Sequence, residues 1–157
     1  MGENKKLMIK AYKLPDQSSQ KNTDVYWIGQ IPKNWEIHRL KRMVGPIIDY
    51  RGATPEKVDD GVFLITAKNI KNGIINYSLS QEYVKPEDYS LIMRRGLPQM
   101  GDVLFTTEAP LGEVANIDNE NIALAQRVIK FRGKSDKLNN YFLRYWMCRA
   151  SLKTGKK

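Results

Sequence analysis

The sequence has one cysteine, one histidine and no long run of apolar residues. A single cysteine, Cys148, excludes an internal disulfide bond and a multi-cysteine zinc site. The histidine, His38, has no clustered ligand partners and no nucleophile motif to serve, which argues against a metal site or a serine hydrolase. No stretch approaches the ~20 apolar residues that span a bilayer, and the first residues lack the apolar segment of a signal peptide. We therefore expect a cytoplasmic protein with no membrane partner.

Closely spaced glycines are also missing. Phosphate-binding loops need them so that backbone N–H groups can surround the anion. In this chain Gly101, Gly112 and Gly133 each stand alone. The sequence therefore gives no sign of a nucleotide-binding loop, and we expect no cofactor in the chain itself.

Positive charge is what the chain has in excess. Its 157 residues, enough to bury one core, include 26 Lys and Arg against 17 Asp and Glu, a net charge of +9. The excess lies in residues 1–46 and 101–157, whereas residues 47–100 are balanced. Such an excess favours a polyanionic partner, with nucleic acid ahead of an anionic membrane surface. A soluble basic protein without such a partner is the alternative.

Short apolar runs separated by Gly, Pro and Asn predict strands joined by turns. Asn72-Gly73, between apolar flanks, predicts a hairpin. A helix is predicted from Pro86 to Arg95, where Arg94 and Arg95 would stabilise its C-terminal end before Gly96. The runs that predict strands are 35–40, 47–50, 62–66, 103–105, 113–117 and 123–131.

The clearest predicted helix is 138–152, where Leu138, Phe142, Tyr145 and Trp146 recur at spacings of three and four. This spacing predicts an amphipathic C-terminal helix whose aromatic stripe packs on the core. Residues 1–24 are polar and lysine-rich, so we expect a mobile leader there and a single domain over 25–157. The predicted class is α+β: a small globular domain with a twisted, mostly antiparallel sheet and flanking helices.

Polar side chains collect where the predicted strands end, which is where loops on a rigid sheet carry recognition residues. Arginine and lysine can bond guanine edges or phosphate, Asn and Gln suit adenine, and a carboxylate can accept a hydrogen bond from cytosine. This mixture favours sequence-specific DNA readout over a uniformly positive groove. The predicted DNA-binding residues are Arg51, Thr66, Lys68, Asn69, Lys71, Thr107, Glu108, Gln126 and Arg127.

A magnesium-dependent nuclease is the enzyme class most compatible with the basic charge. Such an enzyme needs clustered carboxylates, usually with a lysine nearby. Asp102, Glu108 and Glu113 are candidates, but Ala115 occupies the position two residues after Glu113 where a lysine would be wanted. A nuclease that uses Asp102 and Glu108 is therefore kept as an alternative, and Asp102 is expected to be a turn residue.

The order of these motifs resembles the target recognition domain of the specificity subunit of type I restriction-modification systems. The resemblance implies a non-catalytic DNA-binding module that reads one half of a bipartite double-stranded target. It also implies contacts by Thr66, Lys68, Asn69, Thr107, Glu108, Gln126 and Arg127, which lie in matching motifs. The matching segments are 31–36 with Leu40, 64–70, 101–115, 123–128 and the helix from Asn139, with 101–115 and 123–128 the most specific.

The same resemblance implies partners. They are methyltransferase subunits and, through them, restriction subunits; S-adenosylmethionine, ATP and magnesium would belong to these partners. A full specificity subunit has two recognition domains separated by long helices that form a coiled-coil spacer. This chain has no sustained heptad pattern, so we expect one recognition domain without spacer or second domain. A remnant that binds a protein subunit rather than DNA is a further alternative.

Overall fold

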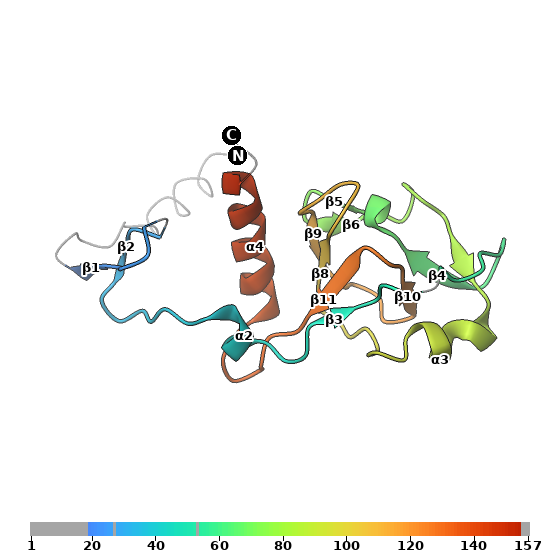
Figure 1. The fold of residues 1–157 in the computed structure, drawn as a ribbon, viewed down its shortest axis with the longest axis horizontal. Helices are drawn as coiled ribbons and strands as arrows, with labels where there is room; N and C mark the ends of the chain where they lie inside the picture. Colours follow the sequence, from blue (N-terminus) through green and yellow to red (C-terminus); the bar gives the residue numbers. More distant parts are fainter. Residues whose placement is uncertain (1–18, 27, 53, 155–157) are drawn as a thin grey trace, which may run out of the picture. The chain divides into compact units, whose positions relative to one another are not determined.

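The computed structural model describes residues 19–26, 28–52 and 54–154, and the chain divides into two compact units, residues 1–38 and 39–157 (Figure 1). In the first unit, β1 (Gln20–Asn22) pairs antiparallel with β2 (Gln30–Pro32). Strand β1 falls within the predicted leader, of which residues 1–18 lie outside the described residues. The predicted domain began at Val25, whereas the compact units divide after His38.

The strand predicted at 35–40 is wrong. The chain forms no strand between residues 33 and 39, and helix α2 (Leu40–Met43) begins where the predicted strand would end. Trp35 and Ile37 alternate with polar residues, yet they are 53% and 46% exposed. No neighbouring strand in the described residues pairs with this segment, so its alternation has no sheet to bury it.

A four-stranded antiparallel sheet forms the centre of the second unit, in the order β3–β11–β8–β9. Val128 of β11 lies opposite Thr106 of β8, and Ile129 lies opposite Asp49 of β3. The end of β3, the start of β11 and the end of β8 therefore meet at one end of the sheet. The strands are β3 (Ile48–Asp49), β8 (Val103–Thr106), β9 (Val114–Asn116) and β11 (Val128–Phe131).

A second sheet, in the order β10–β4–β7, packs beside the first across a shared apolar core. Strand β10 runs parallel to β4, with Leu124 opposite Ile65, and β7 runs antiparallel to β4. A short 3-10 helix, η2, then leads from β4 into the hairpin β5–β6, whose turn at Asn72 and Gly73 confirms the prediction. The bounds are β4 (Val62–Ile65), η2 (Ala67–Asn69), β5 (Ile70–Lys71), β6 (Ile74–Ile75), β7 (Tyr83–Val84) and β10 (Ile122–Leu124).

The apolar run 123–131 is not one strand. A turn at Gln126 and Arg127 divides it into β10, which belongs to the second sheet, and β11, which belongs to the first. Arg127 has φ +73°, in the left-handed region that residues other than glycine rarely adopt. The two polar residues therefore lie where the chain passes from one sheet to the other.

The predicted helix at 86–95 forms as η3 (Pro86–Asp88) followed by α3 (Tyr89–Ile92). The C-terminal helix, α4 (Asn140–Thr154), packs on β8 and β9, on the side of the second unit away from α3 (Figure 1). The Asn139 side chain caps α4, accepting hydrogen bonds from the backbone N–H groups of Tyr141 at 2.8 Å and Phe142 at 3.2 Å.

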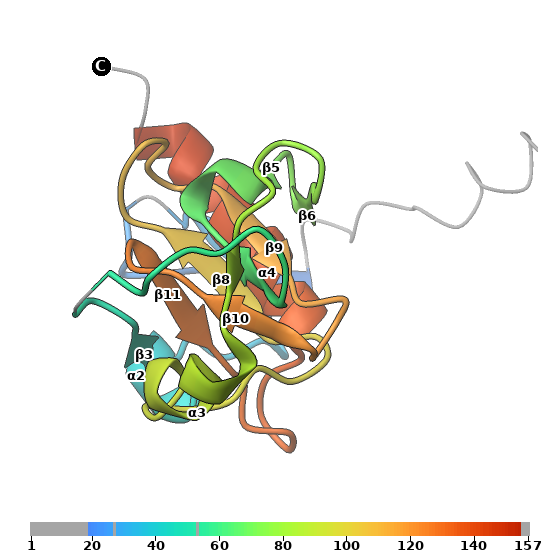
Figure 2. The same cartoon turned by 90° about the vertical axis from the view of Figure 1, so that its right-hand side faces the viewer.

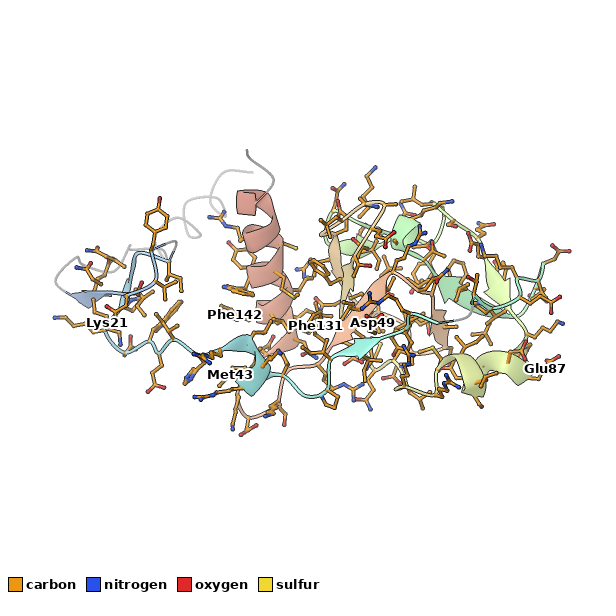
Figure 3. The ribbon with its side chains drawn as sticks, viewed as in Figure 1. Lys21, Met43, Asp49, Glu87, Phe131 and Phe142 are labelled. Carbon is orange, nitrogen blue, oxygen red and sulfur yellow. The ribbon has the colours of Figure 1, made fainter. Side chains whose placement is uncertain are left out.

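The predicted inward stripe of α4 is wrong. Leu143 and Met147 are buried against the sheet, whereas Phe142 and Tyr145 are 52% and 60% exposed. Figure 3 shows Phe142 on the side of α4 away from Phe131 of β11. Leu143 and Met147 are also four residues apart, so the spacing alone did not decide which stripe faces the core.

Asp102 and Lys130 are charged residues buried inside the second unit, and Asp102 is the more buried of the two. Its carboxylate is fully buried and accepts hydrogen bonds from Lys130 Nζ at 3.0 Å and from Arg132 Nε and Nη2 at 2.6 and 2.7 Å. It also accepts one from the backbone N–H of Gln99 at 3.0 Å. Asp102 does make the predicted turn, but its main partners are the two cations. We call Asp102, Lys130 and Arg132 the buried ion cluster.

The α+β class, the mostly antiparallel pairing and the C-terminal helix are confirmed. Within the described part of the chain, no helix has the length and apolar character needed to cross a bilayer.

Candidate nucleic-acid interface

Five predicted DNA-binding residues gather at the end of the four-stranded sheet described above. Arg51 follows β3, Thr107 and Glu108 follow β8, and Gln126 and Arg127 precede β11. We call this set of five side chains the polar edge. Because the strands that carry it are hydrogen-bonded to one another, the loops leave a rigid base.

Backbone hydrogen bonds fix the centre of the polar edge. The N–H of Thr107 donates to the carbonyl oxygen of Arg127 at 2.9 Å, and the Thr107 hydroxyl donates to the same oxygen at 3.2 Å. The Arg127 guanidinium lies 3.4 Å from the Glu108 carboxylate, and the two side chains are 52% and 61% exposed. Both charged groups are therefore accessible to a partner.

Arg51 belongs to the same electrostatic group. Its guanidinium bonds the Asp49 carboxylate at 2.6 and 2.7 Å, and this contact raises the pKa of Arg51, with a smaller contribution from Glu108. Burial alone would raise the pKa of Asp49, but the hydrogen bonds from Arg51 outweigh it and the pKa is lowered. Arg95 holds this segment by donating from Nη1 to the carbonyl oxygens of Asp49 and Arg51, each at 2.5 Å.

Gln126 links the polar edge to the second sheet. Its side-chain Nε2 donates to the Thr54 hydroxyl at 2.7 Å, and the preceding N–H, of Ala125, donates to the Ile65 carbonyl at 2.9 Å. Since β10 and β4 are parallel neighbours, the segment from Thr66 leaves the same end of that sheet as Gln126. The strand topology thus brings the two groups of predicted residues to adjacent loops.

Within the segment from Thr66, one predicted residue is not on the surface. Asn69 is fully buried; its Oδ1 accepts hydrogen bonds from the backbone N–H and the hydroxyl of Thr66, both at 2.9 Å. Its Nδ2 donates to the carbonyl oxygens of Asn76 and Ser80. A buried amide with all these bonds made holds the loop in place and is not available to DNA. We therefore treat Asn69 as a positioning residue.

Lys68 and Lys71 are exposed on this loop and on β5. Two hydrogen bonds hold the turn of the hairpin that follows. The N–H of Asn72 donates to the Glu113 carboxylate at 2.8 Å, and Arg144 donates to the Gly73 carbonyl at 2.9 Å. Glu113 therefore has a structural contact between the hairpin and the start of β9.

The DNA-binding residues predicted from the sequence do not include Leu111, although it lies in the matching segment 101–115. It is 73% exposed in the loop between β8 and β9. The Thr106 hydroxyl donates to the Pro110 carbonyl at 2.5 Å, and the N–H of Gly112 donates to the Thr106 carbonyl at 2.9 Å. The signal available in the sequence is a large apolar residue between Pro110 and Gly112, two residues typical of turns.

The carboxylates of the nuclease alternative do not form a shared site. Asp102 stands before β8 and Glu108 after it, and a four-residue strand spans about 13 Å. Both oxygens of Asp102 are already bonded to Lys130 and Arg132. Among the described residues, no group of three or more His, Cys, Asp or Glu side chains could hold a metal ion.

No protein-family model matches the chain. The chain is 30% identical over 129 residues to the type I restriction enzyme MjaVIII specificity subunit of Methanocaldococcus jannaschii. The alignment covers 75% of this chain and 29% of that protein, so the chain spans less than a third of the relative's length. The similarity supports a domain like one part of a type I specificity subunit.

Proposed function

We propose that this chain is a DNA target recognition domain of a type I restriction-modification specificity subunit, and that it binds a short double-stranded sequence without catalysing a reaction. The observation that carries the proposal is the polar edge. There a guanidinium, a carboxylate and an amide are presented together on loops held by strand pairing. The basic net charge and the similarity to a specificity subunit support the same function.

Each side chain of the polar edge suits a different base contact in the major groove, which is about 12 Å wide. Arg127 can donate two hydrogen bonds to guanine, Glu108 can accept from the amino group of cytosine, and Gln126 can pair with adenine. Leu111 on the neighbouring loop can contact the methyl group of thymine. Lys68 and Lys71 can neutralise phosphates and fix the register of the domain on the duplex.

In this proposal the domain reads one half of a bipartite target. Methyltransferase subunits and, through them, restriction subunits would be its protein partners. In the same proposal, S-adenosylmethionine, ATP and magnesium would be bound by those partners.

The test is a selection from a pool of randomised duplexes with the full chain, followed by sequencing of the bound DNA. We expect one short motif to be enriched and the binding to weaken steeply between about 50 and 200 mM salt, because phosphate contacts release counterions. Uniform recovery of all sequences would contradict a recognition function.

A second candidate function, binding to a protein subunit, is favoured by α4. Tyr141, Phe142 and Tyr145 are 59%, 52% and 60% exposed on this helix, and exposed aromatic residues are enriched in protein interfaces. Co-purification with a methyltransferase subunit, together with no DNA retention, would favour this function over DNA recognition.

A further inference from the structure

A groove of about 310 Å³ opens beside the polar edge. It lies between the segment after β3, the end of α3 and the turn after β10, which are neighbours in Figure 2. Tyr50 and Leu124 are buried beneath it, 8% and 1% exposed. Arg51 and Gln126 line the groove and also belong to the polar edge, so a ligand in the groove would lie next to any base held at that edge.

The arginines of the groove differ in how far their charges are compensated. Arg51 is paired with Asp49. Arg95 bonds two carbonyl oxygens, which carry no full charge. Arg94 is exposed, and no carboxylate lies within salt-bridge distance of it among the described residues.

Two carboxylates also line the groove. Glu56 is paired with Lys85 at 2.8 Å, and Asp88 contributes to the raised pKa of the same lysine, after Glu56. Lys85 therefore offsets one of these two negative charges, while Arg94 and Arg95 lie past the end of α3. The groove is lined by three arginines and two carboxylates, so its end at Arg94 and Arg95 has an excess of positive charge.

The sequence predicted that Arg94 and Arg95 would both stabilise the C-terminal end of the helix, but Arg95 has a different role. Helix α3 ends at Ile92, and the Arg95 guanidinium reaches across to the segment after β3 instead of to the last turn of α3. Arg95 is therefore a positioning residue for Arg51. Arg94 is left with its side chain exposed beside the groove.

Building on the proposed function, we propose that the groove binds the sugar-phosphate backbone of the DNA strand whose bases meet the polar edge, with Arg94 contacting a phosphate. The chemistry of the groove fits this ligand. Its apolar floor suits a sugar, and its arginine end suits a phosphate. Backbone contacts of this kind set the register of a protein on DNA, while base contacts supply specificity.

The test compares Arg94→Ala with the unmodified chain on the selected duplex over a series of salt concentrations. Loss of one phosphate contact should lower the slope of log affinity against log salt by about 0.9, with equal weakening on every sequence. Arg94→Lys should keep most of the slope, because its charge remains. Arg149→Ala removes an exposed arginine from α4, on the other side of the unit, and should leave the slope unchanged.

An Arg94→Ala slope equal to that of the unmodified chain would overturn the groove proposal and leave the recognition function standing. A change of preference at one base position would also overturn it, because Arg94 would then contact a base. An equal loss in Arg149→Ala would show a general charge effect and likewise overturn it. The slope is measurable on unselected DNA too, so failure of the selection would remove the recognition function without deciding the groove.

Discussion

Replacing Asp102 with asparagine is expected to lower the free energy of unfolding by about 3–5 kcal/mol, the usual cost of removing one partner from a buried ion pair. The carboxylate is fully buried, and the Lys130 side chain beside it is only 5% exposed. Without Asp102, the Lys130 ammonium would be buried with no opposite charge. Arg132, whose side chain is 36% exposed, can turn towards water at lower cost. Urea unfolding followed by circular dichroism measures the change.

Two further variants separate the buried charge from a general effect of mutation. Glu56→Gln breaks a surface pair with Lys85 and should change stability far less, because exposed pairs are screened by water. The double variant Asp102→Asn with Lys130→Met should recover much of the loss, because the unpaired charge is gone. A single Asp102 variant as stable as Glu56→Gln would show that the buried ion cluster does not stabilise the fold.

The same carboxylate makes stability depend on pH. Burial alone would raise the pKa of Asp102, but hydrogen bonds from Arg132 and Lys130 outweigh it, so the pKa lies below the usual 3.8. A carboxyl group with a lowered pKa in the folded state stabilises the fold above its unfolded pKa. That contribution is lost as the pH falls through the folded pKa. The unmodified chain should therefore lose more stability below about pH 4 than Asp102→Asn, in parallel acid titrations.

Arg127→Gly is expected to lower the binding preference for the selected duplex by about 1–3 kcal/mol while changing the free energy of unfolding by less than about 1 kcal/mol. Glycine adopts φ +73° without strain, so the substitution removes backbone strain from the folded state. This gain offsets the larger conformational entropy that glycine gives to the unfolded chain. The guanidinium, however, is lost from the polar edge. This one substitution would therefore separate the proposed DNA recognition from folding.

The measurement is affinity for the selected duplex and for duplexes changed at one base pair at a time. The variant should lose its preference at one position and keep it at the others. Arg127→Lys is the matched control, since it retains the charge but cannot form the two parallel hydrogen bonds of arginine. It should bind DNA with the same salt dependence and still lose the preference. An unaltered preference in Arg127→Gly would remove Arg127 from the base-reading residues.

Local signals predicted much of the fold. β-branched residues predicted β4 and Asn72-Gly73 predicted the hairpin, because each signal depends on neighbours in sequence. The apolar run 123–131 could not reveal its division, since the pairing partners Ile65 and Thr106 lie far away in the chain. The division arises because the first part of the run pairs with β4 in one sheet and the second part pairs with β8 in the other.

The candidate site was predicted by residue type but not by contact. Asparagine is common in exposed loops, so the sequence predicted an accessible Asn69. Its burial depends on hydrogen bonds to the carbonyl oxygens of Asn76 and Ser80, which only the structure shows. The partners of Asp102 lie 28 and 30 residues away, so its sequence neighbours show only a turn. Arg94 and Arg95 are adjacent and alike in sequence, yet they differ in their contacts.

The hydrogen bond from the N–H of Thr107 to the Arg127 carbonyl joins two main-chain groups. The bond from Thr106 N–H to the Glu113 carbonyl is of the same kind, and so is the one from Ala125 to Ile65. None of them involves a side-chain atom of residues 108, 126 or 127. If the domain reads DNA as proposed, a change of these side chains would alter the target while the backbone hydrogen bonds that hold the loops stay in place.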